Sequence, residues 1–167
     1  RAITYPCRFE NAFVPDVAEL EDLVTERTVA VLYNFPSNPT GATVDSDQRN
    51  KLVSFAAKHD LWIVTDEVYD KIVYGGDHVS FLGAGYDRVI MLNSFSKTFA
   101  MTGWRIGYVL SPNPKAMEQI TKMQYYVTAC SNDAMQYAVL SAMEKASDYP
   151  DKMREEFQTR RDLICSR

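Results

Sequence analysis

The sequence predicts an α/β domain: a three-layer sandwich around a mostly parallel sheet with one antiparallel strand. Apolar runs at 28–33, 61–64 and 88–92 are rich in valine, isoleucine and leucine, as in strands covered on both faces. Helical patterns separate these runs, which favours parallel pairing. A fourth run, 104–110, follows the third after too few residues for a parallel crossover, so we expect it to run antiparallel.

The helical segments carry recognisable start signals. Asp45 and Gln48 form a capping-box pair, and the helix that they begin is expected to extend through Lys58. Prolines and Asn132 precede other amphipathic patterns, where they suit first-turn and N-cap positions. The remaining helices are expected at 16–24, 114–127, 132–143 and 150–167.

Composition restricts the classes of partner. With 167 residues the chain can bury a sizeable core, and its net charge of −4 argues against nucleic acid and anionic membranes as partners. Cys7, Cys130 and Cys165 are far apart and form no Cys-x-x-Cys pair, so we expect no metal site and a reducing, cytoplasmic environment. No apolar run approaches the roughly 18 residues of a membrane span.

Polar residues follow the predicted strands at their carboxyl ends, where ligands bind in open α/β sheets. If the fourth strand is antiparallel, its beginning returns to the same edge. Seven side chains are then expected there: Asn38, Asp66, Tyr69, Ser94, Ser96, Lys97 and Arg105. Singly, each has an ordinary structural explanation, such as a turn, a cap or a solvated charge. Their placement at successive strand ends indicates a binding site.

The chemistry of this set points to imine formation with pyridoxal 5'-phosphate (PLP). A neutral lysine amine attacks an aldehyde, and the cofactor ring then acts as an electron sink. Asp66 is placed to keep the ring nitrogen protonated, and Asn38 and Tyr69 can hydrogen-bond the phenolic oxygen. The two groups best suited to the phosphate are Ser94 and Arg105.

Four motifs strengthen this interpretation. They are Asn-Pro-Thr-Gly at 38–41, Asp-Glu-Val-Tyr at 66–69, Ser-Phe-Ser-Lys at 94–97 and Gly-Trp-Arg-Ile-Gly at 103–107. In this order, over roughly residues 10–145, the chain resembles the class I and II aminotransferases among the fold-type I PLP enzymes. The resemblance implies transfer of an amino group between an L-amino acid and a 2-oxo acid, usually by a homodimer.

The resemblance also implies roles for individual residues. Lys97 corresponds to the lysine that joins PLP and later carries a proton, with Asp66 and Tyr69 as the other catalytic residues. The cofactor-binding set that it implies comprises Asn38, Asp66, Tyr69, Ser94, Ser96, Lys97 and Arg105.

The same resemblance suggests how the chain is divided. We expect 1–149 to form part of a cofactor-binding large domain and 150–167 to begin an interdomain helix that leads to a small domain. The family's N-terminal phosphate turn and stacking aromatic would precede Arg1, and its substrate-binding arginine would follow Arg167. We therefore expect a fragment that is inactive by itself.

Two unrelated motifs are excluded. Ser94-x-x-Lys97 also occurs in penicillin-binding proteins, but their Lys-Thr-Gly motif is missing, and no nucleotide-binding phosphate loop is present. Other PLP chemistry stays open, because a carbon–sulfur lyase or a decarboxylase shares the core motifs. A PLP-binding regulatory domain fused to a DNA-binding module is also compatible with these residues.

Overall fold

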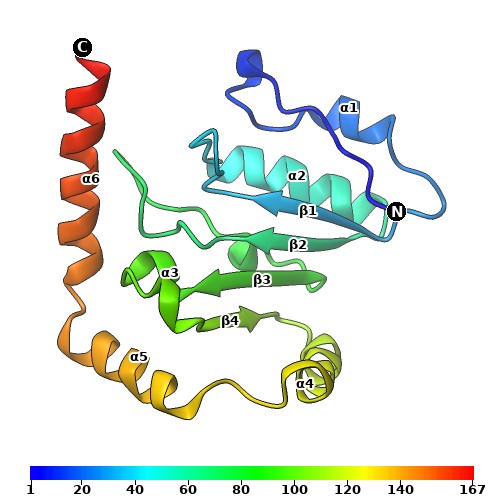
Figure 1. The fold of residues 1–167 in the computed structure, drawn as a ribbon. Helices are drawn as coiled ribbons and strands as arrows, with labels where there is room; N and C mark the ends of the chain where they lie inside the picture. The colour runs from blue at the N-terminus through cyan, green and yellow to red at the C-terminus, as the bar shows by residue number, and fades with distance from the viewer.

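The computed structural model describes residues 1–167 and contains one four-stranded sheet with strand order β1-β2-β3-β4. Three strands run parallel, and the last is antiparallel to its neighbour (Figure 1). The strands are β1 (Ala30–Asn34), β2 (Trp62–Asp66), β3 (Val89–Ser94) and β4 (Gly107–Leu110). This arrangement confirms the predicted mostly parallel sheet with one antiparallel strand.

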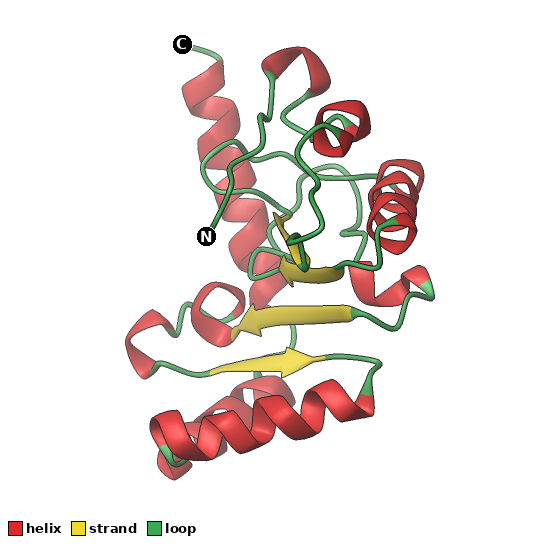
Figure 2. Cartoon of the chain, turned by 90° about the vertical axis from the view of Figure 1, so that its right-hand side faces the viewer, coloured by secondary structure: helices red, strands yellow, loops and turns green.

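Six α-helices surround the sheet (Figure 2). They are α1 (Val17–Glu21), α2 (Ser46–Lys58), α3 (Phe95–Thr98), α4 (Pro114–Thr128), α5 (Asp133–Lys145) and α6 (Tyr149–Cys165). The predicted capping box at the start of α2 is present: Asp45 Oδ1 accepts from the Gln48 N–H at 2.7 Å, and the Asp45 N–H donates to Gln48 Oε1 at 3.0 Å.

The main core lies on one face of the sheet. Alternate strand residues point into it, including Tyr33 and Ile63, whose exposed fraction is 0%. Helix α2 and the 3₁₀ turn Phe81–Ala84 cover this face, and the Phe81 ring stacks on Tyr33 with centroids 5.3 Å apart. The strand residues between these core residues point to the other face, and Leu32 among them is 58% exposed. Because side chains alternate along a strand, neighbouring residues at the strand ends also point to opposite faces of the sheet.

The fourth strand begins later than the sequence suggested. The apolar run 104–110 was expected to be extended throughout, but Thr102–Trp104 forms a 3₁₀ turn and Arg105 has a left-handed φ of +56°. The strand starts at Gly107. The difference arises because Trp104, which is 44% exposed, is apolar without belonging to the sheet. Hydropathy alone does not distinguish such a turn from the strand that follows it.

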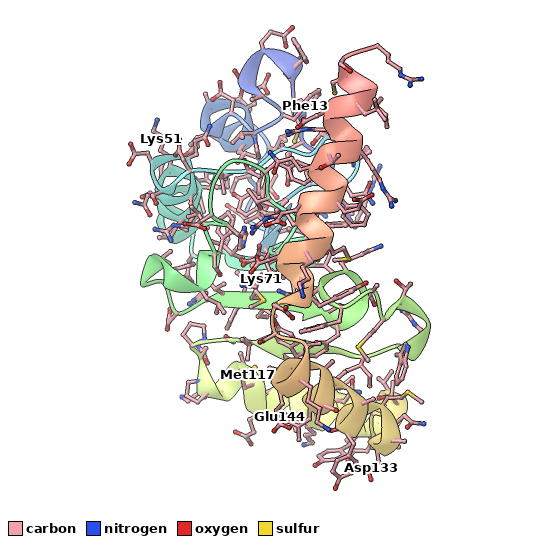
Figure 3. The ribbon with its side chains drawn as sticks, turned by 90° about the vertical axis from the view of Figure 1, so that its left-hand side faces the viewer. Phe13, Lys51, Lys71, Met117, Asp133 and Glu144 are labelled. Carbon is pink, nitrogen blue, oxygen red and sulfur yellow. The ribbon has the colours of Figure 1, made fainter.

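The three C-terminal helices pack less extensively than α2. Figure 3 shows Met117 of α4 and Asp133 and Glu144 of α5 at the end of the molecule remote from Phe13. In the same view, Lys71 lies beside the beginning of α6. Several large apolar side chains of α4 and α5 are exposed: Met123, Tyr125, Tyr126, Val127, Tyr137, Leu140 and Met143. None of the helices combines the length and apolar character needed to cross a membrane.

Candidate active site

The loop after β1 carries the first of the polar residues. Asn34 ends the strand, and its side-chain Oδ1 accepts from the backbone N–H of Asn38 at 2.9 Å. The loop closes on itself, because the Ser37 N–H donates to the Ala42 carbonyl at 2.8 Å. These bonds hold the exposed Asn38 next to the carboxyl end of the strand.

The end of β2 carries the second group. Asp66 is the last strand residue, and its Oδ1 accepts from the Val68 N–H at 3.2 Å. Tyr69 follows three residues later, and its hydroxyl accepts from Asn38 Nδ2 at 3.2 Å. The phenolic proton of Tyr69 therefore remains available for donation to a ligand.

The end of β3 carries the third group. Ser94 caps α3: its Oγ accepts from the Ser96 N–H at 3.0 Å and donates to the Ile106 carbonyl at 3.3 Å. The short helix places the Nζ atom of Lys97 5.4 Å from the centre of the Tyr69 ring. The lysine is thus next to the residue that ends the Asp-Glu-Val-Tyr motif of β2.

The turn before β4 brings Arg105 back to this edge, since Gly107 is paired with Ser94 in the antiparallel register. The Arg105 Nη1 atom donates to the Thr102 carbonyl at 2.8 Å. Thr102 in turn donates from its hydroxyl to the Ser96 carbonyl at 3.1 Å. One continuous set of hydrogen bonds therefore connects the arginine to the segment that carries the lysine.

The charges at this edge have no ionic partners within the chain. Asp66, Lys97 and Arg105 form no salt bridge, although Asp66 and Lys97 are half-buried. Elsewhere, exposed charges do pair, as Lys58 does with Glu21 at 2.9 Å. A half-buried charge without a partner is unfavourable in a purely structural role, so the set suits a ligand with complementary groups.

The donor set fits PLP. An amine, a carboxylate and an amide–phenol pair stand at adjoining strand ends, matching an aldehyde, a ring nitrogen and a phenolic oxygen. The serine hydroxyls and the guanidinium group supply several donors for a phosphate. All seven residues that the sequence singled out lie at, or just beyond, the edge where β1, β2 and β3 end.

Sequence reasoning missed a buried ionisable pair next to Asp66. Glu67, which is 1% exposed, accepts from the Phe81 N–H at 3.0 Å and from the Thr65 hydroxyl at 3.2 Å. Its Oε2 lies 2.7 Å from His78 Nε2. Burial alone would raise the pKa of Glu67, but the hydrogen bonds from His78 and from the Phe81 N–H hold the pKa below its ordinary value. The pair fixes the segment that follows β2.

Asn34 was also missed, although it lies in the predicted strand-to-loop transition. Its carboxamide bonds both to the Asn38 loop and to the Asp66 carbonyl. The available signal was a polar residue directly after the apolar run 28–33.

Comparison with known proteins gives the family. The sequence model described as "Aminotransferase class I and II" matches residues 1–167. The chain is 38% identical to aromatic-amino-acid aminotransferase 2 of Thermococcus litoralis over 100% of its own length and 44% of that protein. It is 39% identical to the aspartate aminotransferase of Thermotoga maritima over 93% of its length and 41% of that protein.

The structural comparison agrees. The crystal structure of the aromatic aminotransferase from Pyrococcus horikoshii superposes with a TM-score of 0.89 and 37% identity, covering 97% of this chain and 44% of that one. The chain belongs to the class I and II aminotransferase family, whose members use PLP. It spans less than half the length of these relatives.

Proposed function

We propose that the protein carrying this chain is a PLP-dependent aminotransferase that moves an amino group between an L-amino acid and a 2-oxo acid. One observation carries the proposal beyond family membership. The unpaired Lys97 amine lies beside the hydrogen-bonded pair of Tyr69 and Asn38, at the strand edge where Asp66 also lacks an ionic partner. This arrangement combines a nucleophilic amine with the groups that orient a pyridine ring.

The proposed catalytic residues are Lys97, Asp66 and Tyr69. PLP, when bound, supplies an aldehyde and an electron-withdrawing ring. Lys97 Nζ would hold the cofactor at its aldehyde and, as a free amine, would carry the proton of the substrate α-carbon. The Asp66 carboxylate keeps the ring nitrogen protonated, because an ionised acceptor favours the charged form of its partner. Tyr69 and Asn38 donate hydrogen bonds to the ring oxygen, which orients the ring.

The remaining groups hold the phosphate. Ser96 offers its hydroxyl, and Arg105 offers the N–H groups that do not bond to Thr102. The Ser94 hydroxyl donates to the Ile106 carbonyl in this structure and would turn from that acceptor to the phosphate. Hydrogen bonds between a guanidinium group and a phosphate are charge-assisted and are stronger than neutral ones. Ser94, Ser96 and Arg105 would hold the cofactor at its phosphate, and Lys97 would hold it at its aldehyde.

We further propose a homodimeric, cytoplasmic enzyme with a second domain. Exposed apolar side chains of α4 and α5, including Tyr125 and Tyr137, are compatible with an interface between subunits. The three cysteines are free and exposed, as is usual in a reducing compartment. Residues 1–149 are proposed as part of the large domain, and 150–167, most of α6, as the beginning of an interdomain helix. The substrates are proposed only as a class, because the relatives' names include both aspartate and aromatic amino acids.

Titration of PLP tests the assignment of the lysine. The unmodified protein is expected to develop the visible absorbance of a lysine-bound cofactor, and Lys97→Ala is expected to lose it while keeping the wild-type circular dichroism. Lys71→Ala is a matched control, because Lys71 is an exposed lysine in the segment after β2. Visible absorbance that persists in Lys97→Ala and disappears in Lys71→Ala would contradict the proposed role.

A further inference from the structure

Asn34 connects two parts of the candidate site that are distant in sequence. Its Oδ1 accepts from the Asn38 N–H at 2.9 Å, and its Nδ2 donates to the Asp66 carbonyl at 3.1 Å. The side chain is half-buried at the last position of β1, directly opposite Asp66 in the parallel register. The Asn34 side chain thus connects the loop that carries Asn38 with the end of β2 that carries Asp66.

The bond to Asn38 determines where that residue's own amide points. Asn38 lies in an exposed loop, so its backbone position depends on the few bonds that tie the loop to the sheet. The Phe35 N–H, which donates to the Asp66 carbonyl at 3.2 Å, fixes only the start of the loop. Three residues further on, the Asn34 carboxamide fixes the Asn38 backbone, and from there Asn38 Nδ2 reaches the Tyr69 hydroxyl at 3.2 Å.

The bond to Asp66 acts on the neighbouring strand. The Asp66 carbonyl accepts both from Asn34 Nδ2 and from the Phe35 N–H. The next peptide N–H, that of Glu67, donates to the Leu92 carbonyl of β3 at 2.9 Å. The peptide plane after Asp66 is therefore held from both sides, and this orients the residue proposed to face the ring nitrogen.

We propose that Asn34 is a positioning residue that couples the Asn38–Tyr69 pair to Asp66 and that acts through these residues without touching the cofactor. The consequence for PLP rests on the proposed function, whereas the coupling itself is a property of the chain. Loss of the Asn34 carboxamide leaves the Asn38 backbone N–H without its acceptor. The loop then moves more freely, and the side-chain amide of Asn38 is no longer held toward Tyr69.

The first test needs no cofactor. Amide hydrogen exchange of the Asn38 N–H is compared in wild type, Asn34→Ala and Asn34→Asp. Exchange should be about 10-fold faster in Asn34→Ala, which lacks the acceptor, because one hydrogen bond contributes roughly a factor of that size. Asn34→Asp keeps an acceptor oxygen and should retain most of the protection. Wild-type protection of Asn38 in Asn34→Ala would overturn the proposal whether or not PLP binds.

The second test uses PLP and a matched control. Asn132→Ala also removes a carboxamide that accepts a backbone N–H, but it does so at the start of α5. Asn34→Ala should bind PLP about 10-fold more weakly. It should also raise the apparent pKa of the pH-dependent change in the visible band, because the Asn38 side chain is no longer held in position to donate to the ring oxygen. Asn132→Ala should leave the band at its wild-type position even if it lowers thermal stability.

A double-mutant cycle separates positioning from a general structural role. If Asn34 acts through Asn38, the band shift of Asn34→Ala should largely vanish in an Asn38→Ala background. Fully additive shifts would contradict this part of the proposal. Absence of a visible band in wild type would refute the proposed function, while the hydrogen-exchange comparison would still decide the role of Asn34.

Discussion

Gly107 allows a close approach between β3 and β4, beside Ser94 and Arg105, which are proposed to bind the phosphate. Gly107→Ala should disrupt this approach. A Cβ atom at this position would stand 2.7 Å from the Asn93 carbonyl oxygen and 3.5 Å from Ser94 Cβ. Ordinary contacts begin near 3.4 Å, so the strands must separate by about 0.7 Å, and such overpacking costs about 2 kcal/mol. For a chain of this size, that cost lowers Tm by about 6 °C.

The same displacement should weaken cofactor binding, because Arg105 lies two residues before the strained position and Ser94 lies opposite it. We expect Kd for PLP to rise about 10-fold, equivalent to the loss of one charge-assisted hydrogen bond. Gly103→Ala is the matched control: a Cβ there meets nothing within 4 Å, and its φ is not left-handed. Thermal melting by circular dichroism and PLP titration measure both effects. Equal Tm and Kd in the two variants would refute the steric argument.

Three further predictions concern the site and its support. Asp66→Asn should reduce turnover far more than PLP affinity, because a neutral amide does not hold the ring nitrogen protonated; a near-normal kcat would remove Asp66 from that role. Arg105→Ala should weaken PLP about 30-fold while leaving the affinity for phosphate-free pyridoxal nearly unchanged, and an equal loss for both ligands would exclude a phosphate contact. The pKa of Glu67 is lowered from 4.5, so its contribution to stability is complete above that pH and is lost as the pH falls through the lowered pKa. Glu67→Gln should therefore lower Tm at pH 7 and flatten the acid limb of the Tm–pH profile, and a profile parallel to that of wild type would contradict this linkage.

The sequence was sufficient for the sheet and for the residues at its carboxyl edge. The runs that became β1, β2 and β3 contain the core residues of the sheet, among them the fully buried Tyr33, Ile63 and Val89. Antiparallel pairing of the fourth strand followed from the short connection alone, since a parallel return needs a longer crossover. Both inferences depend on local spacing, which a single sequence displays.

Side-chain bonds between distant segments were beyond the reach of the sequence. The contact of Asn34 with the Asp66 carbonyl spans 32 positions, and that of His78 with Glu67 crosses a loop. No local sequence pattern predicts either pair. Asparagine, histidine and glutamate are common surface residues, and only the fold shows which of them are buried together. The turn at Arg105 was missed for a related reason: its left-handed φ is set by the reversal between α3 and β4 and not by its own residue type.

Transfer of an isotopically labelled amino group tests the central claim most directly. The protein carrying this chain is loaded with PLP and mixed with a panel of ¹⁵N-labelled L-amino acids, including aspartate and phenylalanine, together with 2-oxoglutarate. The account predicts ¹⁵N-glutamate over many turnovers with at least one donor, and loss of this product in Lys97→Ala but not in Lys71→Ala. Release of carbon dioxide or sulfide without labelled glutamate, or PLP binding without any turnover, would contradict an aminotransferase.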